Sequence, residues 1–226
     1  DLLVLSYFHL LGEFDHFVLS KGHAAAGLYA TQMHKGLLTK ADLEQFNKDG
    51  TVFGAHTPAR KVPTIRFGTG SLGHGLSLAT GLALGARIQG QNPRVIALLS
   101  DGELDEGSTW EAVLFAQHHG LDNLLVMVDV NGLQGFGYTK DVLNLSPLEE
   151  KWRAFNFEVS VCDGHDFEAL IGSVSTLLAA SSGKPKVLLA KTIKGKGVSF
   201  MENQMSWHYL PMSEAQYAQA CAEVRQ

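Results

Sequence analysis

Short apolar runs that alternate with helix-like segments constrain the fold of this chain more than any other feature of its sequence. The runs Arg94 to Leu99, Leu124 to Val128 and Val187 to Ala190 are typical of buried strands. Helix-like segments lie between them, and this alternation is the signature of a parallel sheet covered by helices. The sequence therefore predicts an α/β fold, with a mostly parallel sheet and helices on both faces.

The helices themselves are predicted from residue spacing and from end signals. No internal repeat or linker-like segment divides the chain, so one domain is expected over residues 1–226. Phe157 to Val161 is predicted as a further strand. The predicted helices are Ala24 to Lys35, a short helix opened by Thr39-x-x-Asp42, Gly73 to Gln89, a helix through His119 opened by Ser108-x-x-Glu111, one begun at Ser146-Pro147, Phe167 to Ala180, and one capped at Ser213-x-x-Gln216.

Composition narrows the classes of function. A hydrophobic content of 45% with 18% charged residues argues against disorder, and a net charge of -5 argues against a nucleic-acid binder. No apolar run reaches the roughly 18 residues of a membrane span. Cys162 and Cys221 are the only cysteines and form no ligand cluster, so neither a disulfide framework nor structural zinc is expected. Reduced thiols and a cytoplasmic location are the simplest interpretation.

Polar residues follow two consecutive predicted strands. Asp101 and Gly102 come after the first strand, and Asn131 comes after the next. Ligands of such sheets bind beyond the carboxyl ends of the strands, and a carboxylate with an amide oxygen suits Mg²⁺. Asp-Gly and Asn-Gly are also ordinary turn dipeptides, but their joint placement favours a site. Glu103, in the same acidic run, is interpreted as a solvated acid.

The glycine loop from Gly68 to Gly75 contains a G-x-G-x-x-G pattern that opens a predicted helix. Three interpretations stay open: a phosphate cradle, a dinucleotide-binding fingerprint, and a loop that allows tight helix packing. The fingerprint is weakened because Pro63 makes the preceding segment a poor strand. It is also weakened because the run after Asp101 holds more acid than a ribose hydroxyl needs.

Three histidines, His23, His56 and His208, lie in polar, glycine-containing surroundings. Taken singly, each is more often a surface histidine than a catalytic one. No HExxH spacing supports zinc hydrolysis, and no P-loop motif is present. Lys191, Lys194 and Lys196 are interpreted as solvated.

Several motifs taken together resemble the transketolase family, and most closely the N-terminal half of split, two-subunit transketolases. They occur in the family's order: Ser20-Lys21-Gly22-His23, Gly70 to Gly75, Asp101 to Gly107 with Asn131, and Asp163-Gly164-His165-Asp166. The resemblance implies a diphosphate-binding domain for thiamine diphosphate and Mg²⁺. It implies metal ligands at Asp101, Asn131 and the main-chain oxygen of Leu133. Diphosphate contacts are implied for Gly102, His23 and His208, with His208 also at the reacting centre.

The resemblance also assigns the far side of the cofactor. It implies that Gly70 and Leu72 meet the aminopyrimidine, that His56 faces the donor substrate, and that Glu106 and Glu111 lie near the cofactor and the subunit contact. Tyr209 departs from the family, in which a glycine commonly follows the Trp-His pair, and this change is expected to narrow the pocket.

The implied reaction is transfer of a two-carbon ketol unit between sugars or sugar phosphates. The family's activating glutamate lies on a pyrimidine-binding domain, for which this chain has no candidate. A partner subunit is therefore expected, in paired heterodimers (a heterotetramer). Alternatives are an enzyme of the deoxyxylulose-phosphate synthase type, an NAD-binding oxidoreductase and a noncatalytic assembly subunit.

Overall fold

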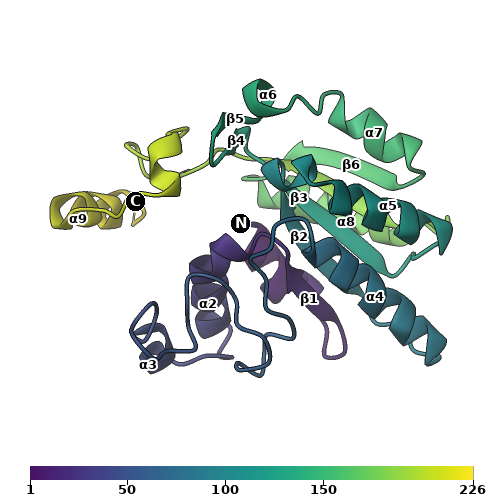
Figure 1. Cartoon of the computed structure of the whole chain (residues 1–226), viewed down its shortest axis with the longest axis horizontal. Coiled ribbons are helices and arrows are strands. Elements are labelled where there is room, and N and C mark those ends of the chain that lie inside the picture. Colours follow the sequence, from purple (N-terminus) through teal and green to yellow (C-terminus); the bar gives the residue numbers. More distant parts are fainter. Residues whose placement is uncertain (226) are drawn as a thin grey trace.

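A five-stranded, fully parallel sheet forms the centre of the structure, a computed structural model that describes residues 1–225 (Figure 1). The strand order is β1-β2-β3-β7-β6. A two-stranded antiparallel hairpin of β4 (Leu133–Gln134) and β5 (Gly137–Tyr138) follows β3. The sheet strands are β1 (His16–Leu19), β2 (Val95–Ser100), β3 (Leu124–Val130), β6 (Glu158–Asp163) and β7 (Lys186–Lys191).

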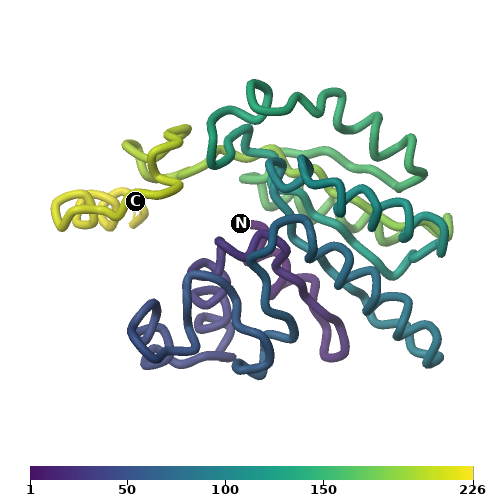
Figure 2. Tube along the Cα trace, in the orientation of Figure 1, coloured from purple at the N-terminus to yellow at the C-terminus, as the bar shows by residue number. Residues whose placement is uncertain are grey.

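Helices cover both faces of this sheet, which confirms the predicted α/β class. The chain path is easiest to follow in the tube of Figure 2. The α-helices are α1 (Leu2–Val4), α2 (Ala25–His34), α3 (Lys40–Leu43), α4 (Gly75–Ile88), α5 (Gly107–His118), α6 (Thr139–Val142), α7 (Leu148–Ala154), α8 (Phe167–Ala179) and α9 (Glu214–Glu223). A π-helix η1 (Leu5–Leu10) and the 3₁₀ helices η2 (Gly22–Ala24), η3 (Gly102–Asp105) and η4 (Met205–His208) complete the set.

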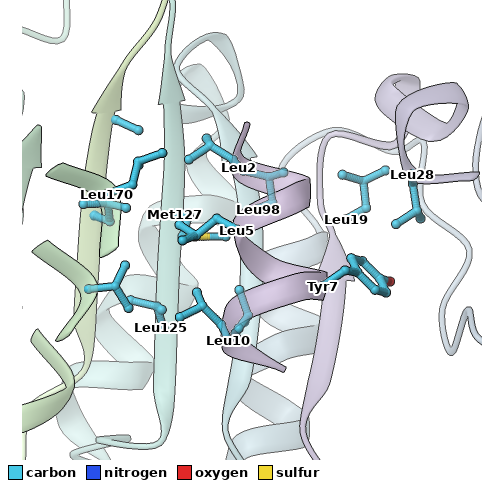
Figure 3. Close-up of a cluster of buried hydrophobic side chains, with 14 of the residues drawn as sticks. Leu2, Leu5, Tyr7, Leu10, Leu19, Leu28, Leu98, Leu125, Met127 and Leu170 are labelled. Atoms are coloured by element: carbon cyan, nitrogen blue, oxygen red, sulfur yellow. The ribbon is translucent and has the colours of Figure 1, made fainter. Parts of the chain in front are cut away.

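The core has two halves because successive strand residues point to opposite faces of the sheet. In β2, Val95, Ala97 and Leu99 pack with α4, α5 and α7, whereas Ile96 and Leu98 pack with η1, α2 and α8. Figure 3 shows the second of these two halves, in which the N-terminal helical segment lies against the face of the sheet. Burial on both faces explains why β2 and β3 are unbroken apolar runs.

Some helix starts differ from prediction. The capping boxes at Thr39 and Ser213 are confirmed. The box predicted at Ser108 is wrong, because α5 begins at Gly107 after Glu106 and has no side-chain cap. At the start of α4, a Cβ on Gly75 would lie 2.2 Å from the Ser20 hydroxyl oxygen, so only glycine lets this helix approach the end of β1.

Two long segments determine what lies at the carboxyl edge of the sheet. Residues 44–74 contain neither helix nor strand and carry the glycine loop to that edge. Residues 194–225, here called the C-terminal arm, leave β7 and project away from the sheet with η4 and α9 (Figure 1). Within residues 1–225, no helix combines the length and the apolar character needed to cross a bilayer.

Candidate functional site

A cavity of about 660 Å³ opens at the carboxyl edge of the sheet. Its walls come from the loops after β1, β2, β3 and β7, from the β4–β5 hairpin and from η4. This position is where parallel α/β sheets bind their ligands. Six of the residues implied by the family resemblance line it, namely His23, Leu72, Gly102, Asn131, Leu133 and His208.

Asp101 lies buried directly after β2, between the cavity-lining residues Ser100 and Gly102. Its carboxylate accepts hydrogen bonds from the main-chain N–H groups of Gly102, at 2.9 Å, and Gly132, at 2.6 Å. These bonds tie the ends of β2 and β3 together. Burial raises the pKa of Asp101 to about 6, and the nearby charge of Asp129 adds to the rise. A carboxylate in this position favours a cation that would neutralise it.

Asn131 and Leu133 follow β3 and lie next to this carboxylate. The Asn131 amide donates to Asp129 at 3.2 Å, and its oxygen accepts from the Leu133 N–H at 3.0 Å. Asp129 also forms an ion pair with Lys21 and accepts from the Thr192 hydroxyl. Burial would raise the pKa of Asp129, but the Lys21 charge and these hydrogen bonds hold it below its ordinary value.

The two acids therefore differ in their charge balance. Lys21 neutralises Asp129, whereas Asp101 has no ion-pair partner among residues 1–225. The described residues also contain no cluster of three His, Cys, Asp or Glu side chains that could hold a metal. A cation at Asp101 would depend on amide, carbonyl and external oxygens, and this donor set is the one that Mg²⁺ accepts together with phosphate.

His23 and His208 face each other across the cavity wall, with ring centroids 5.4 Å apart. Burial, Lys21 and His208 lower the pKa of His23 to about 4. Burial and Lys194 lower the pKa of His208, and the Lys194 Nζ lies 3.4 Å from its Nδ1. Both rings are therefore held neutral near pH 7, so each offers one donor and one acceptor nitrogen.

His56, Gly70 and Glu106 lie outside the residues that line this cavity. His56 packs on Gly70, where an added Cβ would lie 3.2 Å from the ring. Its main-chain oxygen lies 3.3 Å from the Tyr29 hydroxyl that donates to it. Glu106 is exposed and lies against Gly73. The structure thus places these three residues around the glycine loop, apart from the acids at the strand ends.

The interpretation of Glu103 as a solvated acid is wrong. Its side chain is 0% exposed, and its Oε1 accepts from the Ser20 hydroxyl at 2.5 Å and from the Gly73 N–H at 2.9 Å. Burial raises its pKa, and its Oε2 is buried without a hydrogen-bond partner in the described residues. Glu103 therefore joins the loop after β1, the glycine loop and η3 from below.

The lysines after β7 are not all solvated, which corrects a second interpretation. Lys194 is half-buried in the cavity wall, and burial together with the charge of Lys21 lowers its pKa. Lys191 is exposed, and Lys196 lies at the cavity wall 3.8 Å from Glu202. Lys194 follows β7 by three residues, so the rule that strand ends carry sites could have identified it.

The glycine loop does not belong to a dinucleotide fingerprint. Such a fingerprint follows a strand directly, whereas residues 44–74 contain no strand here. Its helix, α4, packs against the end of β1 instead, beside the cavity. The remaining interpretations of the loop are a cradle for phosphate and a means of close packing.

Comparison with known proteins identifies the family. The family described as "Transketolase, thiamine diphosphate binding domain" matches residues 11–224. An apulose-4-phosphate transketolase subunit of Actinobacillus succinogenes is 38% identical over 92% of this chain and 78% of its own length. A 6-deoxy-6-sulfo-D-fructose transketolase subunit of Clostridium sp. is 38% identical over 99% of this chain and 84% of its own.

Solved structures agree with this result. The transketolases of Campylobacter jejuni and Leishmania mexicana superpose with TM-scores of 0.86 and 0.87, each at 28% identity. The match covers 93% and 98% of this chain but only 34% and 36% of those chains. This chain therefore spans about a third of those solved transketolases. The chain belongs to the transketolase family and is a thiamine-diphosphate-binding domain of that family.

Proposed function

We propose that residues 1–226 form one domain that acts as the diphosphate-binding subunit of a two-subunit transketolase. The observation that carries this proposal is the charge arrangement at the carboxyl edge of the sheet. Asp101, a buried carboxylate without an ion-pair partner in the described residues, lies between Ser100 and Gly102 of a cavity wall that also contains Lys21, Lys194 and the neutral rings of His23 and His208. Such a site suits a divalent cation and a diphosphate bound together.

The cation in this proposal is Mg²⁺, held by Asp101, Asn131 and the main-chain oxygen of Leu133. Asp101 supplies the charge, and both of its oxygens keep lone pairs beyond the hydrogen bonds that they accept. The Asn131 side chain is fixed by Asp129 and Leu133, so it needs little ordering on binding. Phosphate oxygens would complete the coordination that three protein ligands leave open.

The diphosphate is assigned to the wall formed by Gly102, His23 and His208, and Lys194 joins this set. Gly102 begins η3 just after β2 and lines the cavity, and an added Cβ there would lie 2.7 Å from Cβ of Gln134, so only glycine fits at this position. Lys194 contributes a positive charge 3.4 Å from His208. Lys21 is already paired with Asp129, so Lys194 is the cation better placed to meet an anion.

The aminopyrimidine and the substrate are assigned to the glycine-loop side. Leu72 lines the cavity, whereas Gly70, two positions earlier in the loop, lies against His56 outside the cavity lining. His56 would face the donor sugar, and Glu106, exposed beside this loop, would lie near the cofactor. This division places the charged end of the cofactor over the strand ends and its ring end over residues 70–73.

The bound cofactor would supply the electron sink that two-carbon ketol transfer requires. The chain's own residues bind it, orient it and move protons. The neutral rings of His23 and His208 can each accept a proton on one nitrogen while donating from the other. Their proximity to Lys194 and Lys21 disfavours the imidazolium form, so a proton taken up there is readily returned.

A partner chain with a pyrimidine-binding domain is part of the proposal, arranged with this chain as paired heterodimers. Two relatives of similar length are named as transketolase subunits, and the solved transketolases are about three times longer. Two exposed apolar side chains that line the cavity, Phe136 at 85% and Tyr209 at 63%, provide surface for such a contact.

Sugars or sugar phosphates are the proposed substrates. The names of the two relatives mention apulose 4-phosphate and a sulfonated deoxyfructose, and these compounds share a sugar carbon chain with an anionic end. The cytoplasm is the proposed location, since Cys162 and Cys221 are free thiols, as in a reducing compartment.

Reconstitution tests this proposal. The purified chain with thiamine diphosphate, Mg²⁺ and a panel of ketose phosphates should transfer no ketol unit, and a pyrimidine-domain chain co-purified through a tag should restore the transfer. Turnover by a preparation that contains only this polypeptide, shown by mass spectrometry, would contradict the need for a second chain. A complex that binds the cofactor but never turns over would favour a noncatalytic assembly role.

A further inference from the structure

The C-terminal arm carries Lys194 and His208 to the cavity but is weakly attached to the rest of the molecule. Among the hydrogen bonds of residues 1–225, those made by the arm stay within residues 193–225 with one exception. In that exception, the Tyr209 hydroxyl donates to the main-chain oxygen of Gly135 at 2.7 Å, between residues 74 positions apart. One side chain therefore bridges the arm and the β4–β5 hairpin.

The contact requires glycine at position 135. A Cβ at this position would lie 2.4 Å from the Tyr209 hydroxyl oxygen and 3.6 Å from Nε2 of His208. The Tyr209 and His208 rings also touch, with centroids 4.8 Å apart. Gly135 follows Leu133 by two residues, so the bridge ties the histidine to the loop that carries two of the proposed metal ligands.

We propose that Tyr209 is a positioning residue, a clasp that holds the His208 segment of the arm over the cavity. The inference rests on the proposed function, because the benefit of the clasp is a histidine already in place when thiamine diphosphate binds. Without the hydrogen bond, the arm would have to be ordered during binding, and that ordering weakens affinity. Tyr209 acts through His208 and the hairpin, and it need not touch the cofactor.

Two variants break the same bond from opposite sides. Tyr209→Phe keeps the ring and removes the hydroxyl. Gly135→Ala displaces the hydroxyl, which can move because it is the far end of a side chain that is 63% exposed. Each variant should weaken thiamine diphosphate binding in Mg²⁺ by about two- to tenfold, the range for one net hydrogen bond. Hydrogen–deuterium exchange of residues 205–210 should quicken by a similar factor.

The double variant gives the sharpest result. Both changes remove the same hydrogen bond. The chain with Tyr209→Phe and Gly135→Ala together should therefore bind thiamine diphosphate as tightly as either single variant, as measured by calorimetry of the full chain. Tyr138→Phe is the matched control, since Tyr138 is 51% exposed on the same hairpin and its hydroxyl makes no hydrogen bond in the described residues. The control should bind and exchange like the unaltered chain, and melting temperatures should be equal throughout.

Two outcomes would overturn the clasp. One is a Tyr209→Phe chain with unaltered exchange at residues 205–210, and the other is a set of fully additive effects in the double variant. If the unaltered chain itself bound no thiamine diphosphate, the proposed function would fail. The exchange data would then still decide whether the clasp exists.

Discussion

The sheet and the C-terminal arm contribute to the same cavity but are held in place very differently. The β2 and β3 strands are almost entirely buried, and Asp101 and Asn131 follow them directly. The arm carries His208 with exposed neighbours, among them Tyr209 at 63% and Leu210 at 59%. The groups proposed to hold the metal are thus fixed by the core, whereas His208, which is proposed to meet the diphosphate and the reacting centre, depends on one clasp.

This contrast separates the expected effects of substitution. Changes at the strand ends should appear in cofactor affinity or in stability, because those side chains belong to the packed body. Changes on the arm should appear in turnover, and in cofactor affinity where they break the Tyr209 clasp, while the melting temperature stays the same.

The largest effect is expected at His208 on the arm. His208→Ala should lower turnover of the complete complex by about 10²- to 10⁴-fold, the usual contribution of a positioned proton-transfer group. The circular dichroism spectrum and the melting temperature should match those of the unaltered chain, because His208 does not pack in either half of the hydrophobic core. Full activity in a folded variant would remove His208 from the chemistry, and an unfolded variant would make its role structural.

Substitutions of Asp101 and Glu103, after the end of β2, should affect different properties. Asp101→Asn should weaken Mg²⁺-dependent cofactor binding by about 10- to 100-fold or more. Loss of a residue that only hydrogen-bonds a metal ligand already has an effect of that size, and Asp101 is proposed to bind the metal directly. Glu103→Ala should instead lower stability by about 1–3 kcal/mol, because the buried Gly73 N–H loses its acceptor. Calorimetry and thermal melting on both variants would separate them, and equal loss of affinity would contradict the assignment of Asp101.

The same Leu→Ala substitution in the sheet and in the C-terminal arm compares how much each region contributes to stability. Leu125 is 0% exposed in β3, so Leu125→Ala should destabilise the chain by about 2–5 kcal/mol. Leu210→Ala is the same substitution on the arm and should change stability by less than about 0.5 kcal/mol. Denaturant titration measures both values. A large loss at Leu210 would show that the arm is part of the cooperative body.

The smallest effect is expected from pH. The folded pKa of His23 is about 4, below the ordinary value of 6.5, so the unfolded chain binds more protons between these values. The contribution of His23 to stability is therefore complete above pH 6.5 and is lost as pH falls toward 4. Solvent in the open cavity screens the charge of His23, so this contribution to stability is small. In His23→Gln, melting temperature should fall less between pH 6.5 and 4 than in the unaltered chain, and identical pH profiles would contradict this.

More of the fold than of the candidate site could be predicted from the sequence. β2 and β3 were predictable because burial on both faces leaves unbroken apolar runs. β1 was missed because its four residues are held as a strand by pairing with β2, Phe17 opposite Ile96. Glu103 could not be told apart from the other acids of the run between Asp101 and Glu106, and its buried hydrogen bond is to Ser20, 83 positions away. The Lys21–Asp129 pair was equally invisible, since its partners are 108 positions apart.

The measurement that bears most directly on the central claim is calorimetric titration of the chain with thiamine diphosphate, in Mg²⁺ and again with excess chelator. The charge arrangement around Asp101 predicts binding in Mg²⁺ and a collapse of affinity in chelator, with no binding of NAD under either condition. Unchanged affinity for thiamine diphosphate in chelator, or tight binding of NAD, would contradict a metal-dependent diphosphate site at this edge of the sheet.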